Sequence, residues 1–481
     1  MLTSNTHPTT KTHDVLLGRL AAASVACAPF WLPIVNDWRA WSTGLVVTLG
    51  EVPLIGFTLL AGPKSVGSII ASVAKHRRNN RHNRHNRHNR HNRHNRLNGL
   101  RQADRYVLGL ALLFAVLAFS LVAHPDIRGV QVLWRVFAMI CLGEHLISRR
   151  IRTTTIAHAL IGITVFEAAI AVWQRVTHAP VGLGILGESP VPFWNFGTKG
   201  FAVNGTLPHP YPLAALALLG GSTALVFGGL RRIQPRIAVI GALASSIIIG
   251  LAISRAGLLS AAGIAVGGLL STIVAWRQNQ TDPAVLGATV PTKLVNHRNP
   301  LLRLVLLGMF VLGLVVSVGA SQDAWSNRVV TQQKSSTLND LTSARGDRLD
   351  EAIGVYRSSP ILGVGPGRYV IELARHPELL HSDPADALPA HNAALLFLAE
   401  GGIPTALALA ILTIVLGRRL LSLGADGIVL LSAVLPFLML DIVFVSLPSG
   451  LFLLGVWGAL VSTLSHDSAR LRRMRHPSIV E

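Results

Sequence analysis

Arg255 and His391 lie at the ends of long apolar runs, and Arg345 and Arg348 lie in the long polar segment between two such runs. Together these side chains could bind an anion and accept a proton. Arg255 sits in a tight turn between two such runs, within the stretch Ser-Arg-Ala-Gly at 254–257, while Arg345 and Arg348 share one face if their stretch is helical. Guanidinium groups stay charged and bind phosphate oxygens bidentately. His391 begins another apolar run, and its imidazole can take a proton from a hydroxyl near neutral pH. These residue types predict an anion clamp beside a general base.

Each of these residues also has a structural interpretation that the sequence leaves open. Arg255 could extend its side chain to lipid headgroups. The acidic residues Asp347, Asp350 and Glu351 could pair with the two neighbouring arginines. A single histidine at a membrane edge, such as His391, often makes a structural hydrogen bond.

Two glycine-containing stretches accompany the basic residues. Pro-Ile-Leu-Gly-Val-Gly-Pro-Gly at 360–367 predicts a tight turn with an exposed backbone, because glycine tolerates positive φ. It is not a dinucleotide-binding motif, since it has no strand–turn–helix context. Glu400 precedes Gly401 and Gly402 and follows His391 by two to three helical turns. We expect Glu400 to orient polar groups in a cavity or to cap an internal break of the helix.

Further polar residues fall into two groups. Asn392, Lys199, His209 and Tyr211 are candidates for substrate contacts, the last three at a substrate entrance. A second group lies inside apolar runs and is assigned to packing networks, with Arg135 pairing with one of the glutamates: Glu51, Arg135, Glu144, Glu167 and Asp441. No paired acidic motif in a connecting loop could hold a divalent ion, so we expect neither a metal nor a cofactor.

The elements that must position these residues are membrane-spanning helices. The chain has 481 residues, of which 50% are hydrophobic and 14% charged, and its apolar residues form runs of about 20, the length that crosses a bilayer. The predicted spans are 15–35, 41–62, 104–124, 129–148, 154–177, 209–230, 236–254, 256–276, 301–320, 391–417, 426–444 and 446–465. The fold class is therefore an all-α polytopic membrane protein with about twelve transmembrane helices.

The distribution of Lys and Arg orients the predicted spans. Dense basic clusters alternate with the spans so that all of them face the cytoplasm when both chain ends lie inside. Residues 1–320 then hold spans 1–9 with a basic cytoplasmic loop at 75–103. Residues 321–390 form a large segment on the opposite side, 391–465 hold spans 10–12, and 466–481 form a basic cytoplasmic tail. The candidate residues Arg255, Arg345 and His391 then face the non-cytoplasmic side of the membrane.

The loop at 75–103 contains five Arg-His-Asn repeats between Arg81 and Asn95. Residues 75–101 carry ten Lys or Arg and no acid, which is half of the net charge of +20. An arm that binds RNA or a metal is one interpretation. A low-complexity loop that faces anionic headgroups is favoured, because no aromatic residue is present for base stacking and no acid or cysteine completes a metal site. We expect no nucleic-acid partner.

The order and placement of the motifs resemble those of the O-antigen ligase/polymerase superfamily, and among its members the lipopolysaccharide O-antigen ligases. The matching stretches run from Pro-His-Pro-Tyr at 208–211 through 254–257, Arg345 and 360–367 to His391-Asn392 and Glu400-Gly-Gly. The resemblance covers about 150 to 445. The aromatic residue that usually follows the arginine by four positions is Leu349 here.

The resemblance implies a membrane-embedded, GT-C-like glycosyltransferase that is metal-independent and inverting. Its donor would be a glycan on undecaprenyl diphosphate, and its acceptor a hydroxyl of lipid A–core at the periplasmic face. Arg255 and Arg345 would bind the diphosphate with Arg348 in support, His391 would act as general base, and Asn392 with Glu400 would support the site.

Three other functions remain open at this stage. An O-antigen polymerase and a protein O-oligosaccharyltransferase share the donor and the arginines and differ in the acceptor. A transporter or flippase of a lipid-linked anion is less favoured, because the two halves of the chain show no self-similarity and the polar cluster lies at one face of the membrane.

Overall fold

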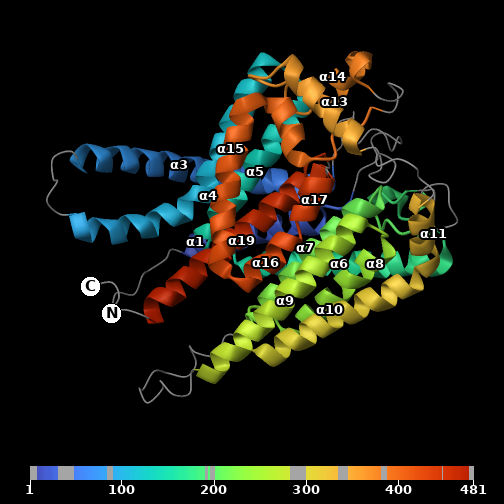
Figure 1. Cartoon of the computed structure of the whole chain (residues 1–481). Helices are drawn as coiled ribbons and strands as arrows, with labels where there is room; N and C mark the ends of the chain where they lie inside the picture. Colours follow the sequence, from blue (N-terminus) through green and yellow to red (C-terminus); the bar gives the residue numbers. More distant parts are fainter. Residues whose placement is uncertain are drawn as a thin grey trace.

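The computed structural model describes residues 8–30, 48–83, 90–189, 193–194, 201–281, 299–333, 345–380, 387–441, 443–446 and 448–475. Helices fill nearly all of these ranges (Figure 1). The helices that lie in predicted spans are α1 (Pro8–Ala26), α3 (Glu51–Asn83), α4 (Arg90–Ala123), α5 (Ile127–Ile147), α6 (Thr153–Thr177), α7 (Pro210–Gly229), α8 (Pro235–Leu251), α9 (Arg255–Thr281), α10 (Pro300–Ala320), α15 (Ala393–Leu423), α16 (Ala425–Ser432), α17 (Leu435–Leu440) and α19 (Pro448–Arg475).

The fold is that of an all-α polytopic membrane protein, as the sequence predicts. Eight of the described helices are long and apolar enough to cross a bilayer, and two apolar stretches, Pro235–Leu251 and Ala425–Leu440, are shorter. The count of twelve spans stays a prediction. The only strands among the described residues are β1 (Phe193–Trp194) and β2 (Phe201–Ala202), which pair antiparallel. Every residue of α7 except Tyr211 is buried, so this helix forms the centre of the bundle.

Two predicted spans differ from the structure. The second was expected at 41–62, but α3 begins at Glu51 and its apolar part runs to Ile70. Pro53 fits this start, because proline is tolerated in the first turn of a helix. The span predicted at 426–444 is divided into α16, α17 and the short α18 (Val443–Ser446). Pro436 cannot donate to a carbonyl of the preceding turn, which explains the end of α16.

The basic loop at 75–103 was also expected to be irregular, and the structure differs here. Helix α3 continues beyond its apolar part to Asn83, and α4 already begins at Arg90, so helices enter the Arg-His-Asn repeat from both sides. Both helical extensions project away from the bundle (Figure 1). Residues 84–89 lie outside the described ranges. We call the end of the bundle that carries these extensions the repeat end.

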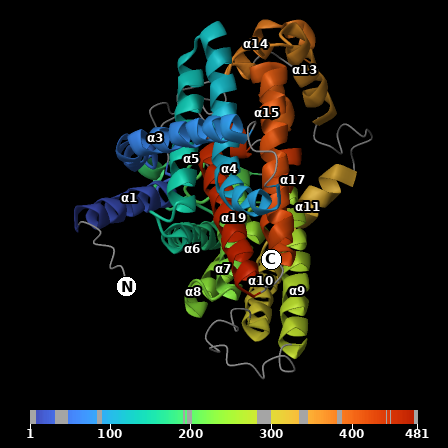
Figure 2. The same cartoon turned by 90° about the vertical axis from the view of Figure 1, so that its left-hand side faces the viewer.

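The large segment at 321–390 lies at the other end of the bundle. Its described helices are α11 (Gln322–Gln333), α13 (Arg345–Ser358), α14 (Tyr369–Arg375) and the short 3-10 helix η5 (Pro377–Leu379). The other short 3-10 helix, η1 (Gly184–Leu186), lies between α6 and β1. A small apolar core joins α13 and α14 to the first turns of α15, with Val355, Leu373 and Leu396 among its members. Figure 2 shows α13 and α14 beside the beginning of α15. We call this end of the bundle the α13 end.

Candidate active site

His391 immediately precedes α15 at the α13 end and is half-buried. The next residue, Asn392, caps the helix: its side-chain oxygen accepts a hydrogen bond from the Leu395 amide at 3.1 Å. The side-chain nitrogen of Asn392 donates to the Met439 carbonyl at 3.4 Å. Asn392 therefore fixes both the start of α15 and its place beside α17. Its predicted contact with substrate remains a prediction.

Arg255 is the first residue of α9 and is half-buried. The turn before it is tight, because Ile253 adopts the left-handed conformation with φ 51°. The Ser254 hydroxyl then accepts a hydrogen bond from the Gly257 amide at 3.1 Å, which satisfies one of the free amides at the helix start. Arg255 thus stands at the N-terminus of a helix, at the predicted turn, and its Nε atom is buried.

Arg255 and His391 lie at the same end of the bundle, at the starts of two helices that both contact α17. Helix α9 packs antiparallel to α16: a Cβ atom on Gly267 would lie 2.9 Å from the Val429 amide, and one on Gly263 would lie 2.5 Å from the Ser432 hydroxyl. At 1.5 Å of rise per residue, this register continues to place Arg255 level with the end of α17. Since α17 contacts both α9 and α15, the two predicted catalytic residues lie on its two neighbours.

Arg345 and Arg348 belong to α13, which packs against α15. Arg345 is the first residue of the helix, and its side chain lies outside the described part. Arg348 is in an ion pair with Glu351, at 2.9 Å, and their side chains are only 11% and 1% exposed. The interpretation that an acid pairs with an arginine here is therefore confirmed for Arg348, whereas its predicted contact with substrate remains a prediction.

The stretch at 360–367 forms one unit with an internal break in α15. Gly402 has φ 65° and ψ −165° inside the helix, and Pro404 follows it. Pro404 has no amide to donate to the Glu400 carbonyl, and the Ile403 amide donates instead to Pro360 at 3.1 Å. The carbonyls of residues 399 and 400 thus lose their helical donors, a costly loss in or near a membrane.

The glycine stretch supplies the missing donors. The Val364 amide donates to the Ala399 carbonyl and the Gly365 amide to the Glu400 carbonyl, each at 2.9 Å. A Cβ atom on Gly363 would lie 2.3 Å from the Glu400 carbonyl, and one on Gly402 would lie 2.2 Å from the Ile361 carbonyl, so these positions exclude any side chain. We call residues 360–367 the splint of α15.

The expected properties of this turn are confirmed only in part. The three glycines of the splint have φ 68°, 102° and 73°, as a tight turn requires. The expected exposure of its backbone is wrong, because Gly363 and Gly365 are buried. The Gly365 amide donates to α15, whereas the Gly363 amide donates to the Ser359 carbonyl at 2.9 Å and the Gly365 carbonyl accepts from the Arg368 amide at 3.2 Å.

Glu400 has its backbone in the break and its side chain at the splint. The carboxylate accepts a hydrogen bond from the Tyr369 amide at 3.4 Å, at the start of α14. Burial raises the pKa of Tyr369 well above its usual range, with the charges of Glu351, Arg348 and Glu400 nearby. The expectation that Glu400 accompanies a helix break is thus met, whereas its predicted contact with substrate remains a prediction.

The predicted substrate entrance around 199–211 contains a helix cap. His209 accepts a hydrogen bond from the Tyr211 amide at 3.2 Å, and its ring lies 4.4 Å from that of Tyr211. Lys199 lies outside the described residues. The loop before His209 is held by α6, because Gln174 accepts from the Gly205 amide at 2.9 Å and Glu167 accepts from the Thr206 amide at 2.9 Å. The packing role assigned to Glu167 is therefore confirmed.

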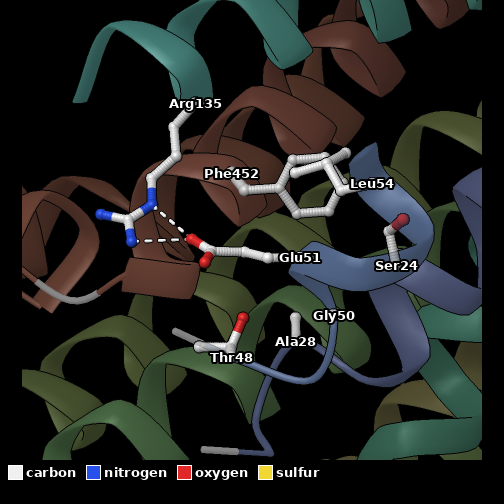
Figure 3. Close-up of a pocket in the computed structure, with 8 residues that line it drawn as sticks. All are labelled: Ser24, Ala28, Thr48, Gly50, Glu51, Leu54, Arg135 and Phe452. Carbon is white, nitrogen blue, oxygen red and sulfur yellow. Dashed lines mark hydrogen bonds and ion pairs between the residues drawn. The ribbon is translucent and has the colours of Figure 1, made fainter. Parts of the chain in front are cut away.

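The polar residues within the spans pair with one another. Arg135 and Glu51 form an ion pair at 2.7 Å beside a small cavity that is also lined by Ser24, Thr48 and Phe452 (Figure 3). This confirms that Arg135 pairs with a glutamate. Glu144 accepts a hydrogen bond from the Ser68 hydroxyl at 2.7 Å, again a packing contact.

Sequence reasoning missed a buried ion pair near the repeat end. Arg303, counted among the basic residues that orient the spans, pairs with Asp426 at 2.6 Å, and both side chains are 5% exposed. Ser271 donates to Asp426 at 2.6 Å, so the pair joins α9, α10 and α16. The signal in the sequence was Asp426 itself, an acid one residue inside an apolar run.

No three His, Cys, Asp or Glu side chains lie together as a metal site within the described ranges. The candidate residues do share one arrangement: Arg255, α13 and His391 lie at the α13 end of a helical membrane bundle. The fold and these residues are those of a multi-pass, all-α membrane protein with basic side chains and an imidazole at one end of its bundle. A family model described as O-antigen ligase matches residues 240–410. The family has ligase or polymerase activity of the membrane glycosyltransferase type. No curated protein matches the chain.

Proposed function

We propose that the protein transfers a glycan from an undecaprenyl-diphosphate carrier to a hydroxyl of lipid A–core, as an O-antigen ligase. The observation that carries this proposal is the family match at 240–410, which includes Arg255, Arg345 and His391 in the order that the resemblance requires. Their helices start at one end of the bundle, which is the geometry that a membrane-anchored donor needs.

In the proposed reaction, the acceptor hydroxyl attacks the anomeric carbon of the donor sugar. His391 takes the proton of this hydroxyl as the new glycosidic bond forms. The bond between the anomeric carbon and the diphosphate oxygen breaks with its electron pair, and the carrier diphosphate leaves. Arg255 and Arg345 neutralise the charge that develops on the diphosphate, which makes a metal ion unnecessary in this proposal. A single displacement inverts the anomeric centre.

The positioning groups complete the proposed mechanism. Asn392 holds the turn that carries His391 through its contact with Met439. Arg348, paired with Glu351, supports α13 and thereby the placement of Arg345. Lys199, His209 and Tyr211 lie in the stretch proposed to admit the donor or the acceptor, and His209 shapes it by capping α7.

We also propose that the protein lies in the bacterial inner membrane with its α13 end in the periplasm. The support is the positive charge of the opposite end, because cytoplasmic loops carry the excess of Lys and Arg. The repeat, the pair Arg149–Arg150, the pair Arg231–Arg232 and the pair Arg418–Arg419 all belong to connections at the repeat end.

The proposal is tested by reconstituting the purified protein in detergent with carrier-linked glycan. Three acceptors are supplied separately: lipid A–core, a second carrier-linked glycan and an unfolded acceptor protein. Transfer to lipid A–core supports the ligase, whereas transfer to the glycan or to the protein identifies a polymerase or an oligosaccharyltransferase. Detergent micelles have no compartments, so a chain that transfers to none of the three acceptors would favour a transporter.

A further inference from the structure

The hydrogen bonds around the break in α15 include a third element besides the splint. Ser120 lies near the end of α4 and is 1% exposed. Its hydroxyl donates to the Leu362 carbonyl at 2.7 Å and lies 3.3 Å from the Glu400 carbonyl. One hydroxyl hydrogen is thus directed at both the splint and the broken helix.

The Glu400 carbonyl needs a hydrogen-bond donor from outside its own helix. Pro404 has removed its helical partner, and a carbonyl oxygen has two lone pairs to satisfy. The Gly365 amide and the Ser120 hydroxyl approach this oxygen from two different elements. The helix α15, the splint and α4 are therefore joined through one atom.

The first part of α15 depends on this junction for its position. The stretch from Asn392 to Gly401 is a half-helix about 14 Å long. One end is held by the Asn392 contact with α17, and the other by the splint and Ser120. His391 stands directly before this half-helix, so a shift at the junction moves the imidazole.

We infer that Ser120 is a positioning residue for His391: it ties the broken end of the half-helix to α4 and thereby fixes the imidazole relative to Arg255. The inference rests on the proposed role of His391 in glycan transfer. Displacement of a catalytic group by about 1 Å can lower a rate about a hundredfold, and loss of one of several hydrogen bonds at the junction should cost less.

The test compares Ser120→Ala with two variants in the full-length chain. Ser120→Thr keeps a hydroxyl, whereas Ser24→Ala removes a serine of equal burial whose hydroxyl bonds only within its own helix, to the Leu20 carbonyl at 2.8 Å. We expect Ser120→Ala to lower kcat about tenfold with KM within about twofold. Ser120→Thr and Ser24→Ala should stay close to the unmodified chain.

Hydrogen exchange gives a readout that does not depend on activity. In Ser120→Ala, the amides of Val364, Gly365 and Ile403 should exchange about tenfold faster, because they close the junction. In Ser24→Ala they should exchange at the unmodified rate. Equal exchange in the two alanine variants would overturn the inference.

The kinetic outcomes separate the inference from the proposed function. If the unmodified chain transfers glycan and Ser120→Ala has an unchanged kcat, the positioning role is wrong and the proposed function stands. If the unmodified chain transfers glycan to none of the acceptors, the proposed function fails and the positioning role fails with it.

Discussion

At the scale of single residues, the candidate site depends on one imidazole that precedes a capped helix. We expect His391→Ala to abolish glycan transfer, because no other group is proposed to take the proton of the acceptor. The cap at Asn392 is retained, so the variant should insert and unfold like the unmodified chain. Transfer is measured in the detergent reconstitution, and a rate equal to that of the unmodified protein would exclude the assignment of His391 as general base.

The second prediction at this scale concerns the geometry of Arg255. We expect Arg255→Lys to lower transfer about tenfold or more, because lysine keeps the charge but loses the planar, bidentate donor. Arg277→Lys is the matched control, since Arg277 lies on the same helix near the repeat end and is exposed. If the two variants were equally active, a point charge at position 255 would be sufficient and the bidentate clamp would be wrong.

At the scale of elements, the splint and the break of α15 can be tested by adding one methyl group. Gly402→Ala should lower the free energy of unfolding by at least about 2 kcal/mol, because it combines a positive φ with a contact at 2.2 Å from the Ile361 carbonyl. Gly308→Ala on α10 should be neutral or slightly stabilising, since nothing lies within 4 Å of its added Cβ atom.

The measurement for the splint is the thermal unfolding midpoint of both variants in the same detergent. Similar midpoints for Gly402→Ala and Gly308→Ala would mean that the break in α15 accepts a side chain. The close packing of the splint against α15 would then be incorrect.

A second element-scale prediction concerns the buried pair between Arg303 and Asp426. Asp426→Asn should destabilise the protein by about 3–5 kcal/mol, because it leaves the arginine buried without its counter-charge. The exposed pair of Arg375 and Glu372, at 3.3 Å with Arg375 60% exposed, provides the control. Arg375→Gln should cost less than about 1 kcal/mol.

Thermal unfolding again compares the two ion-pair variants. The double variant Arg303→Met/Asp426→Leu should recover much of the lost stability, since an apolar pair removes the desolvation of both charges. A double variant as unstable as Asp426→Asn would show that the hydrogen bond with Ser271, rather than the charge balance, holds α9 and α16 together.

At the scale of the whole molecule, the repeat end and the α13 end are predicted to act independently. Replacement of residues 81–96 by a short Gly-Ser linker should leave glycan transfer within about twofold. The helical ends of α3 and α4 that contain the described parts of the repeat project away from the bundle (Figure 1), and other basic clusters still orient the spans. The variant is assayed for membrane insertion and for transfer. Normal insertion without transfer would assign the repeat a part in the reaction.

The sequence by itself determined most of the helices and the class of the protein. Apolar runs of about 20 residues located the spans, because the thickness of the bilayer sets this length. Local chemistry also predicted individual details, such as the positive φ of the splint glycines. These features depend on neighbours in the chain, so they are legible without the tertiary structure.

The family whose model matches residues 240–410 was also recognisable from the order of short motifs. What the sequence did not show is that two of these motifs contact each other. The splint and the stretch Glu-Gly-Gly at 400–402 lie about forty residues apart, yet amides of the splint donate hydrogen bonds to the carbonyls that the break in α15 leaves without helical donors. The sequence therefore predicted a glycine turn and a helix break, but not that the two bond to each other.

Only the tertiary structure decided which polar groups are partners. Arg303 turned out to pair with Asp426, and Ser120 with carbonyls more than two hundred residues away. The physical reason is that a buried polar group must find a partner in three dimensions, while its own residue type says only that a partner is required. The chain thus specifies donors, acceptors and helices locally, and packing of the helices assigns each donor to its acceptor.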